Sequence, residues 1–347
     1  MRRLLRKLFV LLVLVVLASG VAAYWAATRM YESYKGYPEA ETFVEVPVGA
    51  GAAAIGQRLR DAGVVREAAT FRVAVWVSGR ARELKAGEYR FDRPMNAMEV
   101  ASKIARGDVY RRLVTFREGL TIPEMAALFE QVGLGKAADF QAAARDTETI
   151  RALDPAARDL EGYLFPETYA LRRETAASAL VAQMTGLFLK TFTEPMRGAA
   201  KTNGLTVREA VTLASLVEKE TAVAEERPLV AAVYLNRKKA GMPMQADPTV
   251  IFALQRARRY TGNLRREDLQ FDSPYNTYRY PGLPPGPIAS PGQASLEAAV
   301  NPAPVDYLYF VSKNDGSHVF ARTLDEHNRN VQEWQVEYFR QKREGGR

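Results

Sequence analysis

Hydrophobic and polar positions follow three different patterns along the chain. Residues 8–27, LFVLLVLVVLASGVAAYWAA, form one apolar run without a charged side chain. Between residues 43 and 135, a short stretch of alternating polarity is followed three times by apolar residues at helical spacing. Past residue 137, helical patterns alternate with longer loops, and the chain ends with a predicted hairpin at residues 307–323 and a helix at residues 325–340. These patterns predict an α+β fold: an N-terminal apolar helix, a small strand and helix module, and a larger mixed domain.

The apolar run has the length that a helix needs to cross about 30 Å of hydrocarbon. Three Arg and one Lys lie among the first seven residues, and the positive-inside rule places such a flank in the cytoplasm. We therefore expect a cytoplasmic segment at residues 1–7, a single transmembrane anchor at residues 8–27, a linker at residues 28–40, and the rest of the chain outside the cytoplasm. The alternative is a secretory signal peptide that is cleaved near residues 18–23, where small residues gather.

The repeated pattern predicts three strand–turn–helix units, and each unit closes on a glycine that suits a helix C-cap: Gly63, Gly107 and Gly133. A further helical pattern lies between the first two units, at residues 67–82. One such unit cannot bury a face alone, so the units should pack together. Residues 41–112 resemble the lysin-motif modules that bind N-acetylated glycans. A small domain without any binding function explains the same pattern.

The segment ASLVEKET, at residues 214–221, places two glutamates two positions apart in a predicted amphipathic helix. Thr206 and Glu209 form a capping box that marks the start of this helix. On the helical wheel, Glu218 and Glu220 fall at opposite edges of the apolar stripe, and Thr212 and Ser215 lie on the polar side. Both glutamates therefore fit a general acid in semi-apolar surroundings, and both fit an ordinary solvated charge. Periodicity alone does not choose between them.

Three segments of the larger domain combine polar and aromatic side chains in a way that suits neutral sugars. They are residues 158–171, which also fit a core loop, residues 243–250, and a long loop at residues 273–292 that is dense in Pro and Gly. No Gly-rich phosphate loop accompanies them. The candidates for binding a sugar are Glu167, Gln245, Asp247, Tyr275 and Asn276.

Composition narrows the chemistry of the chain. The 347 residues are 47% hydrophobic and 25% charged, a globular profile with enough apolar material for a sizeable core. The net charge of +8 fits an anionic surface or polymer, but basic and acidic residues are intermixed, so we expect no nucleic-acid partner. The absence of cysteine excludes thiolate catalysis and zinc–thiolate sites. The two histidines, His318 and His327, lack neighbouring ligands, so we expect no metal and no cofactor.

Several long segments resemble one family in order along the chain, the endolytic murein transglycosylases or YceG-like proteins. These segments are LEGYLFPETY, LASLVEKETAVAEERPLVAAVYLNR, MQADPTVIFAL, YNTYRYPGLPPGPIASPG and YLYFVSKNDGSHVFARTLDEHN. The resemblance implies that residues 113–340 form the catalytic domain and that residues 341–347 are a C-terminal tail. In this family the first glutamate of the EKET run is the catalytic acid, which here is Glu218.

The resemblance also implies a reaction and a cellular setting. Such enzymes cleave the bond between N-acetylmuramic acid and N-acetylglucosamine inside nascent peptidoglycan strands, form a 1,6-anhydro end, and so limit strand length. One carboxyl group is enough, because it can protonate the leaving oxygen and then take the proton of the C6 hydroxyl that closes the ring. Family members are single-pass proteins of the bacterial inner membrane, with the catalytic part in the periplasm and penicillin-binding synthases as expected partners.

Two other functions stay open from the sequence. A hydrolase of the muramidase type needs a second carboxylate to position water, and Glu220, Asp247 or Glu167 are candidates for that role. A glycan-binding scaffold without catalysis needs no catalytic carboxyl group at all, so it predicts that Glu218 is dispensable.

Overall fold

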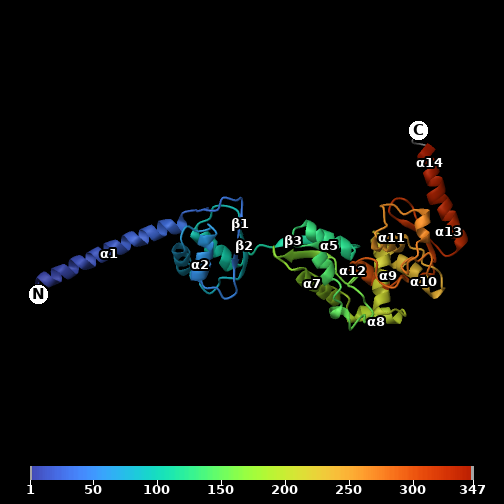
Figure 1. Ribbon diagram of the computed structural model, residues 1–347, viewed down its shortest axis with the longest axis horizontal. Helices are drawn as coiled ribbons and strands as arrows, with labels where there is room; N and C mark the ends of the chain where they lie inside the picture. Colours follow the sequence, from blue (N-terminus) through green and yellow to red (C-terminus); the bar gives the residue numbers. More distant parts are fainter. Residues whose placement is uncertain (1, 345–347) are drawn as a thin grey trace. The chain divides into compact units, whose positions relative to one another are not determined.

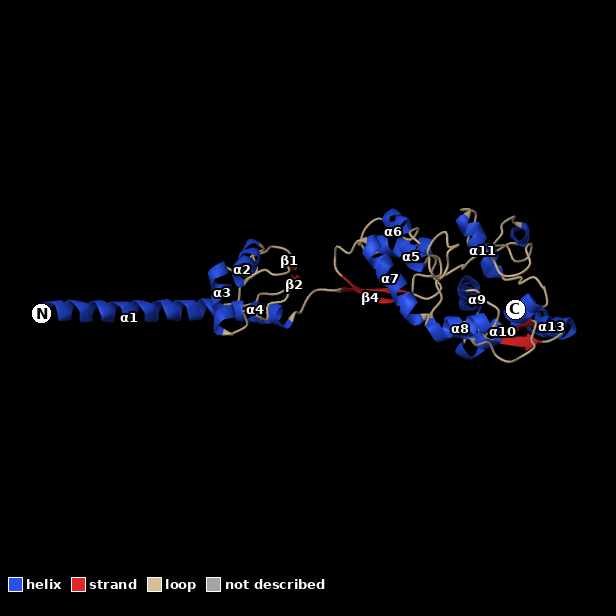
Figure 2. Ribbon diagram, turned by 90° about the horizontal axis from the view of Figure 1, so that it is seen from below, coloured by secondary structure: helices blue, strands red, loops and turns tan. Residues whose placement is uncertain are grey.

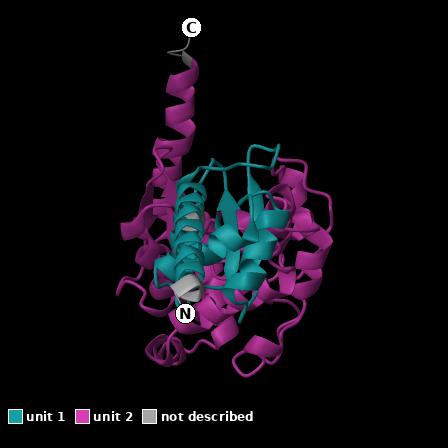
Figure 3. Ribbon diagram, turned by 90° about the vertical axis from the view of Figure 1, so that its left-hand side faces the viewer, with its two compact units in different colours: residues 1–112 teal, residues 113–347 magenta. Residues whose placement is uncertain are grey.

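A computed structural model describes residues 2–344. The chain divides into two compact units, Met1–Arg112 and Leu113–Arg347, which Figure 3 draws in different colours. Whether the first unit is a lysin-motif-like glycan binder stays a prediction.

Unit 1 contains the first two predicted strand–turn–helix repeats. Its elements are α1 (Arg2–Tyr31), β1 (Thr42–Val46), α2 (Ala52–Asp61), α3 (Ala68–Val77), β2 (Gly87–Phe91) and α4 (Ala97–Arg106). The two strands pair antiparallel, with Thr42 opposite Phe91. Helix α4 begins at a capping box made by Asn96 and Glu99 and ends at Gly107, whose φ of 73° is the left-handed C-cap expected from the sequence. The predicted repeats and the helix between them are confirmed.

The core of unit 1 forms because alternate strand residues point to one face of the sheet. Val44 and Val46 of β1 and Tyr89 and Phe91 of β2 are buried there with apolar residues of the three short helices. Met30, near the end of α1, belongs to the same core. In the described part of the chain, no helix is both long enough and apolar enough to cross a membrane. The anchor at residues 8–27 therefore stays a prediction from the sequence.

Unit 2 is mostly helical. Its helices are α5 (Ile122–Gln131), α6 (Ala137–Ala143), α7 (Ala177–Thr191), α8 (Glu194–Thr202), α9 (Val207–Glu220), α10 (Arg227–Lys239), α11 (Asp247–Arg256), α12 (Gln293–Val300), α13 (Leu324–Val331) and α14 (Tyr338–Glu344). Shorter turns are η1 (Glu148–Ile150), η2 (Ala224–Glu226), η3 (Arg266–Gln270) and the π-helical η4 (Gln332–Glu337). Strand β3 (Arg112–Phe116) pairs with β4 (Glu167–Leu171), and β5 (Tyr309–Ser312) pairs antiparallel with β6 (His318–Ala321). The mixed α+β fold predicted from the sequence is confirmed.

Helix α9 is the central helix of unit 2 (Figures 1 and 2). It packs against α8, α10, α11 and α12, and every residue from 210 to 217 is buried. The predicted polar side of this helix was therefore wrong, because Thr212 and Ser215, which the helical wheel places there, are also buried. Ser215 tolerates this burial because its hydroxyl donates to the Thr212 carbonyl at 2.7 Å and accepts the Ile288 N–H at 3.0 Å. The predicted capping box of Thr206 and Glu209 is confirmed.

The predicted C-terminal hairpin is confirmed as β5 and β6, and it is tied to the chain just past α9. Glu226 accepts the backbone N–H of His318 at 2.7 Å, and its Oε2 lies 2.7 Å from Nδ1 of the same residue. Thr221, the C-cap of α9, donates its hydroxyl to Glu226 Oε2 at 3.1 Å. The helical pattern at residues 325–340 is present as α13, η4 and α14, so a π segment interrupts it.

Gly162 is the point where the LEGYLFPET segment meets α9 and the long loop. Its φ is +82°, and a Cβ atom there would lie 2.4 Å from Pro287 Cβ and 3.1 Å from Val211 Cγ1. A side chain at this position is therefore excluded both by the backbone conformation and by packed neighbours.

Gly162→Ala should lower the free energy of unfolding by about 2–4 kcal/mol, because it adds backbone strain to overpacking. Gly186→Ala is the matched control, since Gly186 lies inside α7 and a Cβ there meets nothing within 4 Å. That control should be neutral or more stable by up to about 1 kcal/mol. Urea denaturation of both variants checks this, and equal stabilities would contradict it.

Candidate active site

Glu218 lies in the last turn of α9, and the start of α12 holds its carboxyl group. Its Oε2 accepts the backbone N–H of Gly292 at 3.0 Å and the hydroxyl of Ser295 at 2.8 Å. Gly292 is the N-cap of α12, where the positive end of the helix dipole stabilises negative charge. Among the described residues, no hydrogen bond engages the other oxygen, Oε1. One oxygen is therefore fixed and the other is left for a ligand.

A groove of about 680 Å³ opens at Glu218. It is bounded by the end of β3 and the loop after it, the start of β4, and the residues that begin α10 and α12. Five charged side chains line it: Arg117, Glu118, Glu167, Glu218 and Arg227. The structure thus brings Glu167, a candidate from the sequence, into the same groove as Glu218.

Glu118 and Arg227 give this groove its electrostatic character. Partial burial and then the charge of Glu218 raise the pKa of Glu118, while the charge of Arg227 opposes this shift. Arg227 is the first residue of α10, and its Nε is buried without a hydrogen-bond partner among the described residues. Glu118, whose pKa is raised, therefore lies near the charges of both Glu218 and Arg227.

Glu220 lies away from the groove, because residues two apart on a helix of 3.6 residues per turn point in nearly opposite directions. Its Oε1 accepts the hydroxyl of Tyr234 at 2.7 Å. Burial raises the pKa of Glu220, and the Tyr234 hydrogen bond opposes that shift. The geometry thus separates the two glutamates that the helical wheel left equivalent: only Glu218 lines the groove.

Four other candidates from the sequence do not line this groove. Gln245 is exposed and has a φ of 49°. Asp247 begins α11 and accepts the hydroxyl of Tyr278 at 2.6 Å. Asn276 is fully buried, and its amide donates to the backbone carbonyls of Leu269 and Phe271, so it stabilises its own loop.

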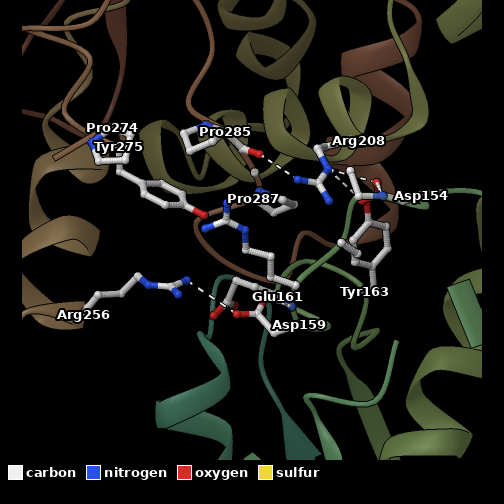
Figure 4. A pocket seen from close by; sticks show the side chains of 14 residues that line it. Asp154, Asp159, Glu161, Tyr163, Arg208, Arg256, Pro274, Tyr275, Pro285 and Pro287 are labelled. Carbon is white, nitrogen blue, oxygen red and sulfur yellow. Dashed lines mark hydrogen bonds and ion pairs between the residues drawn. The ribbon is translucent and has the colours of Figure 1, made fainter. Parts of the chain in front are cut away.

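Tyr275, the fourth of these candidates, lines a separate cavity of about 340 Å³ (Figure 4). Its ring lies 5.0 Å from that of Phe252, and the Arg256 guanidinium lies 5.6 Å from the Tyr275 ring. Whether Gln245, Asp247, Tyr275 or Asn276 contacts a substrate stays a prediction.

The cavity in Figure 4 contains a buried carboxyl group, Glu161. Both of its oxygens lie 3.2 Å from the backbone nitrogen of Ile122, at the start of α5, and accept its N–H. Burial nevertheless raises the pKa of Glu161 to about 8, with the Ile122 bond opposing the shift. Arg208 pairs with Asp154 at 2.9 Å in the same cavity. Tyr163 of the LEGYLFPET segment donates its hydroxyl to the same Asp154 carboxyl group at 2.6 Å, so these groups connect the segment to α9 and α5.

Comparison with known proteins shows to which family the chain belongs. The sequence model of the YceG-like family matches residues 44–333. The chain belongs to the YceG-like family. An endolytic murein transglycosylase of Bacillus subtilis (strain 168) is 34% identical over 306 residues, which are 82% of this chain and 82% of that relative.

Two further relatives of the YceG-like chain agree with this assignment. An endolytic murein transglycosylase of Streptococcus pneumoniae serotype 2 (strain D39 / NCTC 7466) is 32% identical over 84% of this chain, and the match spans 58% of that longer relative. A crystal structure titled as a yceG-like protein from Listeria monocytogenes has a TM-score of 0.57 at 30% identity, over 84% of this chain and 98% of that chain.

Sequence reasoning on this YceG-like chain missed Glu118, Arg227, Gly292 and Ser295. Glu118 had a local signal, because it stands between the end of a strand and Gly119, whose φ of 75° marks a sharp turn. Ser295 had none, since its contact with Glu218 joins residues 77 positions apart. The long-range contacts that complete the groove therefore needed the fold.

Glu161 should make stability depend on pH. Its pKa rises from an ordinary value of 4.5 to about 8 on folding, so the folded state holds a proton that the unfolded state releases. The contribution of this proton to the free energy of unfolding is complete below about pH 4.5 and is lost as the pH rises through about 8. Glu161→Gln should therefore raise the free energy of unfolding at pH 9, relative to the parent chain, by on the order of 3 kcal/mol more than at pH 5. Chemical denaturation at pH 5 and pH 9 measures the two free energies of unfolding. The variant Glu167→Gln, at an exposed position, is the control. An equal stability difference between Glu161→Gln and the parent chain at both pH values would refute the prediction.

Proposed function

We propose that the chain is an endolytic lytic transglycosylase that cleaves the bond between N-acetylmuramic acid and N-acetylglucosamine in peptidoglycan strands. The observation that carries this proposal is the position of Glu218, held by Gly292 and Ser295 at the edge of a groove with one oxygen left for a ligand. Family membership and the names of the relatives support the same reaction class.

In the proposed reaction, Glu218 gives a proton to the glycosidic oxygen as the bond from that oxygen to muramic acid C1 breaks. The bonding electrons go to the leaving oxygen. The C6 hydroxyl of the same sugar attacks C1, loses its proton to the Glu218 carboxylate, and closes the 1,6-anhydro ring. No water is consumed, and the carboxyl group is ready for another cycle. Ser295 and the Gly292 N–H keep the carboxyl group in place during both proton transfers.

A hydrolase of the muramidase type is the second candidate function, because Glu118 and Glu167 supply further carboxyl groups in the groove. The two functions differ in their product. Mass spectrometry of peptidoglycan digested by the purified full-length chain decides between them. A 1,6-anhydro end is lighter than a reducing end by one water and supports the transglycosylase. A reducing end supports the hydrolase, and an undigested polymer supports a non-catalytic scaffold.

Glu218→Gln should lower the release of anhydro ends by about 10⁴-fold or more, because general acid–base catalysis contributes about 10²–10⁴-fold and this mechanism uses the group twice. Glu220→Gln is the matched control from the same helix turn. It should keep most of the activity, since a Gln oxygen can still accept the Tyr234 hydroxyl. Thermal melts confirm that both variants fold. Near-normal release by Glu218→Gln, or a larger loss in Glu220→Gln, would remove Glu218 from its role.

We also propose that residues 8–27 anchor the protein in the bacterial inner membrane with the catalytic part in the periplasm. The support is the uncharged run itself and the exposure of the apolar side chains from Leu8 to Leu17, each at 40% or more. Limiting the length of nascent strands, and working beside penicillin-binding synthases, are further parts of this proposal that rest on the family resemblance.

The anchor predicts a defined topology. A reporter that is active only outside the cytoplasm, fused after Arg347, should be active, and the fusion should stay in the membrane at full size. A shortened, released product would show a cleaved signal peptide instead, and an inactive reporter would place the catalytic part in the cytoplasm.

A further inference from the structure

Two carboxyl groups meet at Gly292. Glu218 Oε2 accepts the Gly292 N–H at 3.0 Å. On the other side, a Cβ atom built on Gly292 would lie 1.8 Å from Glu118 Oε1 and 2.2 Å from Glu118 Cδ. The Glu118 carboxyl group therefore occupies the space that a side chain at position 292 would take. Both carboxyl groups line the same groove.

The segments that hold Glu218 also fix the backbone of Glu118. The N–H of Gly119 donates to the Ser290 carbonyl at 2.8 Å, and the N–H of Ser290 donates to the Leu120 carbonyl at 2.9 Å. Lys219, next to Glu218 on α9, donates to the Gly119 carbonyl at 3.1 Å. The loop after β3 is thus joined both to α9 and to the chain that leads into α12. This network fixes the backbone directly after Glu118, whose side chain lines the groove.

The charges around Glu118 come from α9, α10, β4 and the segment of Glu118 itself. Glu218 and Lys219 belong to α9, Arg227 to α10, and Glu167 to β4, while Arg117 precedes Glu118 on its own segment. Burial and Glu218 raise the pKa of Glu118, and Arg227 opposes them. Two carboxyl groups at one site resist double ionisation, so the charge of Glu218 favours the protonated form of Glu118.

We propose that Glu118 is a positioning residue of the reaction, which acts through Glu218 by sharing the single proton that the groove delivers to the glycosidic oxygen. This inference rests on the proposed function. The pair gives its proton to the leaving oxygen as the C1–O bond breaks and the electron pair moves to that oxygen. The C6 oxygen then bonds to C1, and the C6 hydroxyl proton returns to the pair. The site thus ends in the protonation state in which it began. Between the two proton transfers both carboxyl groups are ionised, and their negative charge stabilises the positive charge that develops at C1.

The test is the pH profile of kcat for the full-length chain, measured as ends released from peptidoglycan. Glu118→Gln removes the acid whose raised pKa keeps a proton in the groove at higher pH. The alkaline limb of the profile should move to lower pH by about one unit or more, with much of the activity kept at the acidic plateau. Glu174→Gln, an exposed glutamate outside the groove, is the matched control and should keep the parent profile.

A loss of activity that is equal at all pH values would show a merely structural role for Glu118, and an unchanged profile would show no role; either outcome overturns the inference. The nature of the ends is read separately. Reducing ends from the parent chain would overturn the proposed transglycosylase while the shift of the profile still tests the pair.

A second variant keeps the inference testable if Glu118→Gln fails to fold. Gly292→Ala retains both carboxyl groups, and the backbone at Gly292 accepts alanine because its φ is −76°. The three atoms nearest the new methyl group all belong to the flexible Glu118 side chain, which must leave its place beside Gly292. The alkaline limb should shift in the same direction as in Glu118→Gln. A folded Gly292→Ala chain with the parent profile would overturn the pairing.

Discussion

The burial of α9 on all sides is the constraint on which unit 2 depends. A helix that is surrounded by α8, α10, α11 and α12 cannot rotate or slide without opening the core. Its last turn is therefore a fixed point from which Glu218 reaches the N-terminus of α12. The LEGYLFPET segment, the long loop and the C-terminal hairpin each contact α9 or the residues just after it. The packing that stabilises unit 2 therefore also sets the geometry of the groove.

Local sequence signals were enough for most of the secondary structure. Capping boxes, glycine C-caps and strand alternation depend on residues a few positions apart, and these predictions were confirmed at Thr206, Gly107 and β1. The mixed α+β class follows from them. The burial of Ser215 on the polar side of α9 was not predictable, because its hydroxyl accepts the N–H of Ile288, 73 positions away, while it donates to the Thr212 carbonyl. A helical wheel does not contain such a long-range partner.

The candidate site was derived from the sequence in a different way. The family resemblance pointed to Glu218, and the geometry supplies the physical distinction from Glu220 that periodicity lacked: one glutamate lines a groove and the other accepts a hydrogen bond from Tyr234. Glu118, Gly292 and Ser295 reach Glu218 from segments that are far away in sequence. In the long loop, the Asn276 amide bonds the backbone of its own loop, and its predicted contact with a substrate stays a prediction.

The two hydrogen bonds that hold Oε2 of Glu218 also orient its other oxygen. Both come from the start of α12, the Gly292 N–H and the Ser295 hydroxyl, so rotating the carboxyl group breaks at least one of them. The direction from which a ligand can reach Oε1 is therefore set by residues 74 and 77 positions away in the sequence.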